Sequence, residues 1–322
     1  MTTPKIELHV HLEGAIRPAT LLDIARRNGQ SLPVQDEAGL RALYEFTDFA
    51  HFIEVWILTT NCLRTRDDFR QVAVDYAAEA AGFGAVYVEA IFSPGERVAR
   101  GVGWDDVFGG YCDGAQEAYE RYGVIMRYTP DLYRGLDPDV AEESARVAIR
   151  YRDRGVVGFG LGGMESRPAA PYYRAFEIAR DGGLGLVPHA GEAAGPESVR
   201  EMLALRPARL RHGIRAAEDP ELLAEIVAAG VVLDVCPTSN LRTGVVRTIE
   251  EHPLPALRAA GALCTINTDD PAMFGTDLGQ EYAIAERLGV SAADAYKAGV
   301  AGALCDNSTR THLAEVGEQR LR

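Results

Sequence analysis

Two histidines near the start of the sequence have the spacing of a same-face pair. His9 and His11 lie in the stretch KIELHVHLEG (5–14), which otherwise reads as a β-strand. In an extended chain residues i and i+2 point to the same face, so both imidazoles would point to the same place. Because imidazole is the commonest metal ligand, this spacing predicts a metal site.

Other polar side chains lie where later apolar runs end. They are His189, Glu192, His212, Asp269 and Asp270. If these runs are parallel strands of one barrel, their carboxyl ends meet at one face. The three imidazoles and the carboxylate of His9, His11, His189 and Asp269 would suit a divalent metal ion, most often zinc.

Each of these residues also has a simpler interpretation. A single histidine near a strand end is usually a hydrogen-bonded structural residue, and Glu192 and His212 taken alone would be solvated loop residues. The pair Asp269 and Asp270 precedes a proline and is consistent with a turn. Convergence of all of them at one end of one barrel favours the metal site.

Eight short apolar runs, rich in β-branched residues, predict strands. The runs are 5–11, 85–92, 124–129, 156–163, 184–192, 209–213, 231–240 and 264–271. Near-continuous apolar runs are typical of parallel strands covered on both faces, and the last five follow one another at about 20 to 35 residues. The pattern predicts an α/β fold, a (β/α)8 TIM barrel, and a single domain over residues 1–322.

The connection between the first two predicted strands is unusually long. It spans about 70 residues and includes a helical pattern of apolar side chains. Long insertions at the active-site face often act as lids, so we expect Phe49, Phe52 and Trp56 to form an apolar wall over the substrate. The same side chains would also serve simply to pack the helix onto the barrel.

Composition excludes several classes of partner. The formal net charge is −14, and Lys5 and Lys297 are the only lysines, so no basic stripe is available for nucleic acid. No run approaches the roughly 18 apolar residues of a membrane span, and no signal peptide is expected. Five cysteines without paired spacing suit a reducing cytoplasm. The sequence leaves the oligomeric state open.

The motifs H-V-H-L-E-G, H-A-G-E, R-H-G, C-P-T-S-N and N-T-D-D-P, in this order, resemble those of the adenosine deaminase family within the amidohydrolase superfamily. The resemblance covers nearly the whole sequence. It implies a (β/α)8 barrel that deaminates a 6-aminopurine nucleoside hydrolytically and binds one zinc ion per chain. The implied zinc ligands are His9, His11, His189 and Asp269.

The same resemblance implies roles for the remaining motif residues. Glu192 would be the proton shuttle, which protonates purine N1 and makes C6 electrophilic. His212 would orient the attacking hydroxide, Asp270 would meet purine N7, and the backbone N–H of Gly163 would meet purine N3.

Three positions depart from the usual family pattern. Glu13 replaces the aspartate whose carboxylate meets the ribose 5′ end, Arg211 interrupts R-I-G-H-G, and Met164 interrupts A-G-D-E. We expect the metal site and the shuttle to be unaffected and the 5′ substituent of the nucleoside to differ. Aminodeoxyfutalosine, an adenine nucleoside of menaquinone synthesis with an aromatic carboxylate at its 5′ end, is one candidate.

An anionic substituent would need a cation in this acidic protein. Four arginines in predicted loops on the active-site side are candidates: Arg64, Arg66, Arg134 and Arg167.

Three other functions are weighed. An adenine deaminase receives partial support from Glu13. A two-metal amidohydrolase would need a carboxylated lysine at the end of the fourth strand, and the run 156–163 contains no lysine. A non-catalytic binding protein would lack a ligand or the shuttle, whereas all six positions are occupied. The H-x-E and P-C-x-x-C signature of the other zinc deaminases is absent.

Overall fold

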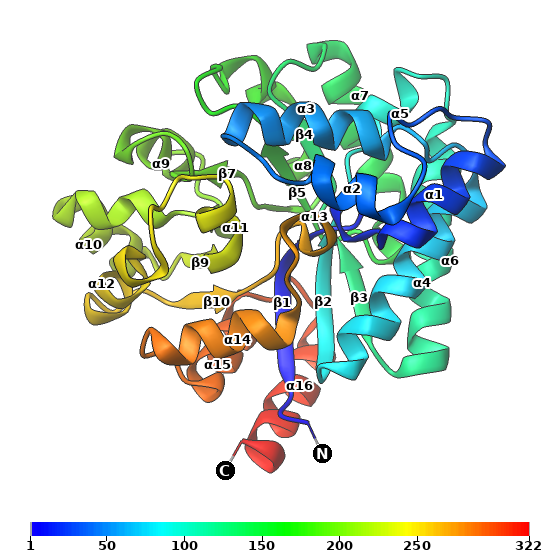
Figure 1. Cartoon of the computed structure of the whole chain (residues 1–322). Helices are drawn as coiled ribbons and strands as arrows, with labels where there is room; N and C mark the ends of the chain where they lie inside the picture. The colour runs from blue at the N-terminus through cyan, green and yellow to red at the C-terminus, as the bar shows by residue number, and fades with distance from the viewer. Residues whose placement is uncertain (1, 322) are drawn as a thin grey trace.

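Apolar strands alternate with helices along the chain, and the structure, a computed structural model that describes residues 2–321, closes them into a barrel (Figure 1). The strands are β1 (Lys5–His11), β2 (Ala85–Ile91), β3 (Ile125–Tyr128), β4 (Asp131–Tyr133), β5 (Gly158–Gly162), β6 (Gly185–Leu186), β7 (His189–Ala190), β8 (Arg209–His212), β9 (Val232–Val235) and β10 (Cys264–Ile266).

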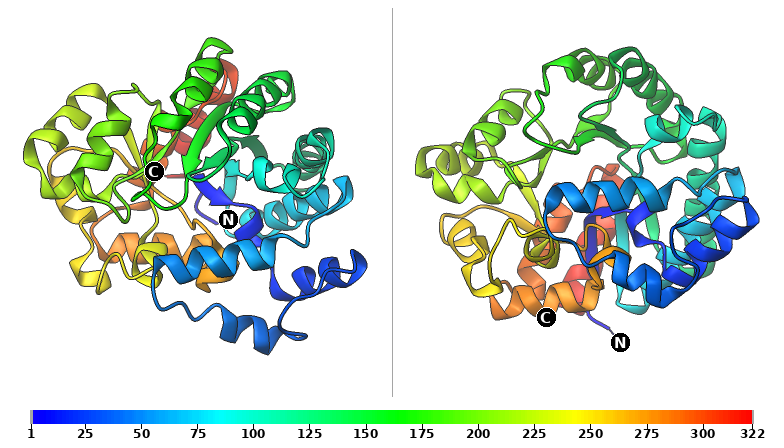
Figure 2. Two further views of the ribbon diagram at one scale, coloured as in Figure 1. Left: turned by 90° about the horizontal axis from the view of Figure 1, so that it is seen from above. Right: turned by 45° about the horizontal axis from the view of Figure 1, so that its top comes forward.

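Helices surround the strands on the outside, as the view from above in Figure 2 shows. The helices are α1 (Pro18–Arg27), α2 (Glu37–Leu43), α3 (Phe49–Thr60), α4 (Arg66–Gly82), α5 (Pro94–Val98), α6 (Trp104–Tyr122), α7 (Pro138–Arg150), α8 (Tyr173–Asp181), α9 (Pro196–Leu203), α10 (Pro220–Ala229), α11 (Pro237–Arg242), α12 (Leu254–Ala259), α13 (Pro271–Phe274), α14 (Leu278–Arg287), α15 (Ala292–Gly302) and α16 (Asn307–Arg320). None of the helices in residues 2–321 is long and apolar enough to span a membrane.

All strand pairs are parallel, and they follow one another in chain order. The ladders run β1–β2–β3, β4–β5–β6 and β7–β8–β9–β10. The barrel closes where Val10 of β1 bridges to Asp269, just beyond β10. This topology confirms the predicted (β/α)8 fold; a single domain over the whole chain stays a prediction.

Two strands of the barrel are divided at a proline. Beyond the predicted run 124–129 the strand resumes after Pro130 as β4, and the fifth predicted strand divides into β6 and β7 on either side of Pro188. Proline has no N–H to donate to a ladder. Both proline carbonyls still accept a backbone hydrogen bond from the next strand, so each divided pair forms one strand of the barrel.

The seventh predicted strand is shorter than expected. β9 ends at Val235, and Pro237 begins α11 inside the run 231–240 that was predicted to be extended. Proline suits the first turn of a helix, because the N–H that it lacks would have no partner there. Ser239 and Asn240 therefore project from a helix beside the barrel mouth.

The insertion between β1 and β2 contributes α1 to α4. Its predicted apolar pattern forms α3, capped by the Asp48 carboxylate, which accepts from the N–H of His51. In Figure 1, α3 crosses the end of the barrel toward which β1 runs. Phe52 packs against Phe274 of α13 with ring centroids 5.0 Å apart. The helix is thus attached to the loop that follows the last strand.

Ion pairs occupy part of the barrel interior. Arg209 is fully buried, and its guanidinium lies 2.8 Å from the Glu89 carboxylate and 2.9 Å from that of Asp234. These three residues come from β8, β2 and β9, so the pairs join two consecutive strands to one that is distant in sequence. Removing one partner of such a buried pair leaves the remaining charges buried without an opposite charge.

We therefore expect Arg209→Met to lower the free energy of unfolding by about 3–5 kcal/mol, because two carboxylates would remain buried without a cation. Urea denaturation measures this loss. Arg26→Met is the matched control, since Arg26 pairs with Asp23 on the exposed surface of α1 and should lose at most about 0.5 kcal/mol. Equal losses for the two variants would contradict the interpretation.

Candidate metal and catalytic site

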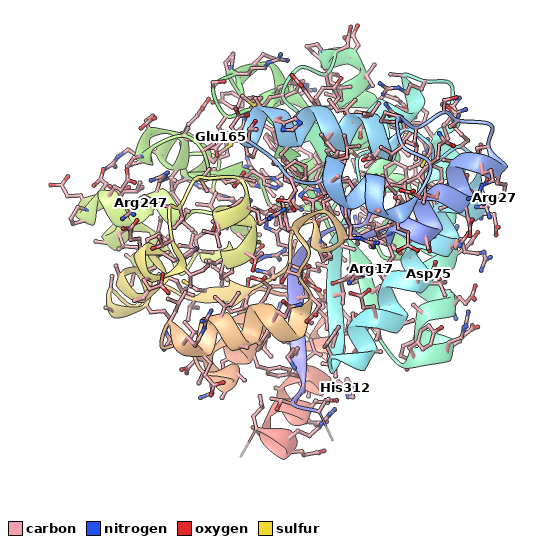
Figure 3. All side chains as sticks on the ribbon, viewed as in Figure 1. Arg17, Arg27, Asp75, Glu165, Arg247 and His312 are labelled. Carbon is pink, nitrogen blue, oxygen red and sulfur yellow. The ribbon has the colours of Figure 1, made fainter. Side chains whose placement is uncertain are left out.

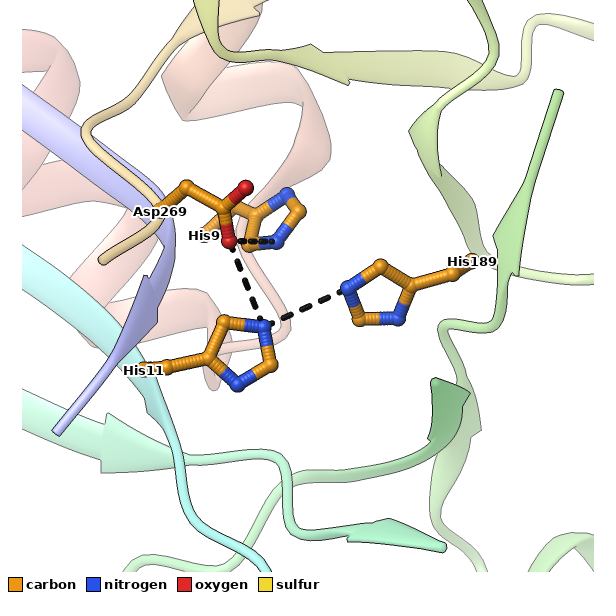
Figure 4. A group of neighbouring side chains, drawn as sticks. All are labelled: His9, His11, His189 and Asp269. Carbon is orange, nitrogen blue, oxygen red and sulfur yellow. Dashed lines mark hydrogen bonds and ion pairs between the residues drawn. The ribbon is translucent and has the colours of Figure 1, made fainter. Parts of the chain in front are cut away.

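The four predicted metal ligands converge at the carboxyl ends of the strands, as Figure 4 shows. Asp269 Oδ1 lies 3.1 Å from His9 Nε2 and 3.4 Å from His11 Nε2, and His11 Nε2 lies 3.3 Å from His189 Nε2. Ligands placed 2.0–2.1 Å from a tetrahedral zinc ion are separated by about 3.3–3.4 Å. The spacing of these atoms therefore fits one zinc-sized ion.

The backbone at two site residues is strained. His212 and Asp269 have φ values of 58° and 64°, in the left-handed region that side chains other than glycine seldom adopt. Such conformations cost about 1–3 kcal/mol and persist where the surrounding structure demands them. At both positions the strained backbone lies at a strand end and directs the side chain toward the cluster.

His189 is oriented from its far side. Its Nδ1 lies 3.1 Å from the carbonyl oxygen of Leu161 and 3.3 Å from Asp131 Oδ2, which leaves Nε2 free to bind a metal ion. Arg211 pairs with the other oxygen of Asp131. A Cβ at Gly160 would lie 2.2 Å from Asp131 Oδ1, so this glycine makes room for the pair. Arg211, which departs from the family pattern, therefore pairs with the aspartate that contacts the predicted ligand His189.

The C-P-T-S-N motif supplies contacts that the sequence interpretation had not assigned. Ser239 Oγ donates to Asp269 Oδ2 at 2.6 Å, and Cys236 Sγ lies 3.5 Å from His9 Nδ1. Asn240 Nδ2 lies 3.3 Å from His212 Nδ1. The sequence signal for these contacts was the position of the motif just beyond a predicted strand. The predicted metal ligands were found by the same rule, that polar residues at the carboxyl ends of barrel strands form the site.

Burial controls the protonation of the cluster. It lowers the pKa values of His11, His189 and His212 well below the ordinary value, so these imidazoles are neutral and can act as ligands or hydrogen-bonding groups. Burial alone would raise the pKa of Asp269, but the surrounding imidazoles, led by His9, hold it well below its usual range. The cluster thus combines neutral nitrogens with one ionised carboxylate.

Glu192 lies at the edge of the cluster, in surroundings that favour its protonated form. Burial, followed by the negative charges of Asp269 and Glu165, raises its pKa well above the ordinary value. Its Oε2 lies 3.5 Å from His212 Nε2. A carboxylic acid that keeps its proton near neutral pH can donate that proton to a bound base.

Asp270 is held by the helix that crosses the barrel. Its Oδ1 accepts a hydrogen bond of 2.9 Å from Trp56 Nε1. A Cβ at Gly14 would lie 1.7 Å from the same oxygen, so the carboxyl group occupies the space that this glycine leaves. Trp56, expected only as part of an apolar wall, is therefore also a hydrogen-bond donor. Direct contact of Asp270 with a purine stays a prediction.

A pocket of about 860 Å³, partly open to solvent, lies next to the cluster. Phe49, Phe52 and Trp56 all line it, as the lid interpretation expects. Gly163 lines it too, with a φ of 84° and an N–H that donates to no acceptor among residues 2–321. A free amide donor at this wall suits the nitrogen of a bound heterocycle.

The four candidate arginines divide into two groups. Arg134 and Arg167 line the pocket. Arg64 donates to the backbone carbonyl of Arg100, and Arg66 is the first residue of α4, where it pairs with Asp113 of α6. The expectation that all four lie in loops facing the site is therefore wrong for Arg66, because the capping box of Thr65 begins a helix there.

Glu13 is buried behind the pocket wall. Its Oε1 accepts from the backbone N–H of Ser93 at 3.0 Å, and Ser93 itself lines the pocket. Burial raises the pKa of Glu13 to about 7, and the charge of Arg97 opposes that rise. Glu13 shapes the wall through Ser93, and direct contact with the ribose stays a prediction.

Comparison with known proteins identifies the family. The sequence model described as "Adenosine deaminase" matches residues 4–318. The chain belongs to the adenosine deaminase family. It is accordingly a metal-dependent amidohydrolase, as the cluster geometry suggests.

Individual members of the adenosine deaminase family resemble it closely. A protein of Acidothermus cellulolyticus named "Aminodeoxyfutalosine deaminase" is 58% identical, with 98% of this chain and 91% of that protein covered. The crystal structure of an adenine deaminase from Arthrobacter aurescens superposes with a TM-score of 0.93 at 29% identity, covering 99% of both chains. A Burkholderia amidohydrolase solved with bound Zn has a TM-score of 0.88 at 25% identity, covering 99% of this chain and 92% of that one.

In this adenosine deaminase family member the loop that carries Glu192 is anchored by Glu165, which is labelled in Figure 3. The Glu165 carboxylate accepts backbone N–H bonds from Gly191 at 2.7 Å and from Glu192 and Ala193 at 2.9 Å. Ser198 Oγ donates to it as well. One charged acceptor therefore fixes three consecutive amides of the loop.

We expect Glu165→Ala to release this loop. Hydrogen bonds to a charged group contribute about 1.5–3 kcal/mol, so amide exchange at residues 191–193 should accelerate by about 10- to 150-fold. Hydrogen–deuterium exchange followed by mass spectrometry measures the change. Ser198→Ala, which removes only the hydroxyl donor, should leave exchange near the native rate. Unchanged exchange in Glu165→Ala would show that the loop is held by other contacts.

Proposed function

We propose that the protein is a zinc-dependent aminohydrolase that converts a 5′-substituted adenine nucleoside of the aminodeoxyfutalosine type to the 6-oxopurine nucleoside and ammonia. The observation that carries the proposal is the convergence of four ligand atoms within 4.8 Å of one another beside Glu192, whose buried surroundings raise its pKa. The similarity to the Acidothermus protein supports the nucleoside, and five free cysteines support a cytoplasmic location.

The residues divide the chemistry as follows. His9, His11, His189 and Asp269 would hold a zinc ion, which would lower the pKa of water toward about 7 and supply hydroxide at neutral pH. Glu192 protonates N1 of the purine, so that C6 accepts the nucleophile. The resulting carboxylate then takes the proton of the hydroxyl group added at C6 and passes it to the departing amine, so that the C6–N bond breaks and ammonia leaves. His212, 3.5 Å from Glu192, orients the attacking oxygen.

The purine is held on two sides. Asp270 presents its carboxyl group toward N7, and the hydrogen bond from Trp56 fixes that group in place. Burial and the charge of Asp269 raise the pKa of Asp270 well above its ordinary value, which favours the protonated form that would donate to N7. The free N–H of Gly163 faces N3 on the opposite side.

The part of the pocket lined by Phe49, Ile53, Arg134 and Arg167, here called the outer pocket, supports a 5′ substituent that is aromatic and anionic. Phe49 and Ile53 of α3 provide apolar surface there. Arg134 and Arg167 line the same pocket, and neither forms an ion pair with a carboxylate of residues 2–321. In a protein of net charge −14, arginines without a carboxylate partner at a substrate pocket are suited to a substrate anion.

Adenine deamination is the second candidate. It is favoured by the close superposition on the Arthrobacter adenine deaminase and by a glutamate at position 13. A free base would leave the outer pocket with its two arginines unused, and this favours the nucleoside. Comparison of kcat/KM for adenine, adenosine and aminodeoxyfutalosine distinguishes the candidates.

Glu192→Gln tests the shuttle and the metal count together. The amide keeps the size of the side chain but cannot transfer the proton, so kcat should fall by about 10²- to 10⁴-fold. Elemental analysis should find one zinc ion per chain in both proteins, because Glu192 is not a ligand, and chelation should abolish activity. Glu225→Gln, on the exposed face of α10, is the control. Two metal ions per chain, or loss of metal from Glu192→Gln, would refute the assignment.

Arg167→Gln tests the 5′ anion. Arg167 is exposed at the pocket, and its Nη1 donates only to the carbonyl of Arg134 among the described residues, at 3.3 Å. Loss of a charge-assisted bond should lower kcat/KM for aminodeoxyfutalosine by about 10- to 150-fold and change that for adenosine little. Arg66→Gln, away from the pocket, should affect neither substrate. If the unmodified enzyme has the same kcat/KM for adenosine as for aminodeoxyfutalosine, the 5′ assignment is contradicted.

A further inference from the structure

A buried chain of hydrogen bonds connects the start of α12 with His212. The backbone N–H of Leu254 donates to His252 Nδ1 at 3.1 Å. His252 Nε2 lies 3.1 Å from Asn240 Oδ1, and Asn240 Nδ2 lies 3.3 Å from His212 Nδ1. The side chains are sealed from solvent, with exposures of 3% for His252, 0% for Asn240 and 1% for His212.

The direction of this chain is determined at its first bond. A backbone N–H can only donate, so His252 Nδ1 is an acceptor, and a neutral imidazole then carries its hydrogen on Nε2. Burial lowers the pKa of His252 to about 4, so the ring is neutral at pH 7. Its Nε2–H donates to Asn240 Oδ1, which turns the amide NH₂ of Asn240 toward His212.

The amide of Asn240 in turn decides the tautomer of His212. Because Asn240 Nδ2 donates to His212 Nδ1, that nitrogen is an acceptor and the ring hydrogen lies on Nε2. His212 Nε2 is buried without a hydrogen-bond partner among residues 2–321. It lies 3.5 Å from Glu192 Oε2 and 3.7 Å from Asp269 Oδ2. The N–H therefore points into the space between the proton shuttle and the predicted ligands.

We propose that Asn240 and His252 are positioning residues that hold His212 in the Nε2–H tautomer, so that His212 donates a hydrogen bond to the attacking oxygen and cannot act as its base. The inference rests on the proposed deaminase function. It extends the catalytic arrangement to two residues that touch neither the substrate nor the predicted metal ligands. A histidine tautomer set by the bond at its other nitrogen is a general feature of oriented imidazoles.

Asn240→Asp reverses the direction of the hydrogen bond to His212 Nδ1 while keeping the shape of the side chain. A carboxylate accepts but does not donate, so it would require a hydrogen on His212 Nδ1. His212 Nε2, which faces the attacking oxygen, would then lose its hydrogen, or the ring would carry a hydrogen on both nitrogens and become an imidazolium. We expect kcat to fall by about 10²- to 10⁴-fold with KM changed much less, since a misdirected imidazole fails in the chemical step.

Nitrogen-15 NMR of the zinc-loaded protein reads the tautomer without any substrate. The chain contains seven histidines, and the signals of His212 are identified by their loss in His212→Asn. The wild-type protein should show His212 with a protonated Nε2 and a bare Nδ1, and Asn240→Asp should place a hydrogen on Nδ1. His312→Gln, on the exposed face of α16, is the neutral histidine control and should leave the His212 signals unchanged.

Two further variants complete the test. His252→Gln keeps a donor for Asn240 Oδ1, so it should retain the His212 tautomer and lose less activity than Asn240→Asp. Asn240→Ser serves if the aspartate variant fails to fold; it should leave His212 as a mixture of tautomers. A wild-type His212 protonated on Nδ1, or a tautomer that does not respond to either change at position 240, overturns the inference even if the enzyme deaminates its substrate. The expected tautomer without turnover of any 6-aminopurine overturns the proposed function instead.

Discussion

The closure of the barrel is the constraint on which the site depends. The N–H of Asp269 donates to the carbonyl of His9 at 3.1 Å, and the N–H of His11 donates to the carbonyl of Asp269 at 2.7 Å. These two backbone bonds join the first strand to the end of the last one. They place predicted ligands from opposite ends of the chain within about one tetrahedral edge of each other. Without this closure the H-x-H pair would lack its carboxylate.

The neighbouring carboxyl groups of Asp269 and Asp270 show how environment assigns chemistry. The imidazoles around Asp269 hold its pKa well below the usual range, whereas burial and the charge of Asp269 raise the pKa of Asp270 well above it. The surroundings therefore favour the ionised form of Asp269, a predicted ligand, and the protonated form of Asp270. Adjacent titratable groups whose pKa values are shifted in opposite directions are typical of acid–base sites in enzymes.

Rigid anchoring of the side chains predicted to be catalytic is a second feature of the site. Glu165 fixes the loop of Glu192 through three backbone amides, Trp56 fixes Asp270, and Asn240 fixes the ring of His212. Each anchor is a hydrogen bond made away from the substrate. The site is thus preorganised before binding, which lowers the reorganisation required during reaction.

The sequence by itself determined the barrel and predicted the metal ligands, because period-two spacing and apolar runs are local properties of the chain. The predicted role of Glu192 came from the resemblance of its motifs to the adenosine deaminase family. His9 and His11 follow directly from the alternation of side chains along one strand. Local patterns could not show that the barrel strands continue across Pro130 and Pro188, since the proline carbonyls are paired only through neighbouring strands. Tertiary structure alone decided the partners of Trp56, Glu165 and Asn240. Their bonds join segments from 26 to 214 residues apart, and such contacts depend on how the barrel closes rather than on any nearby residue.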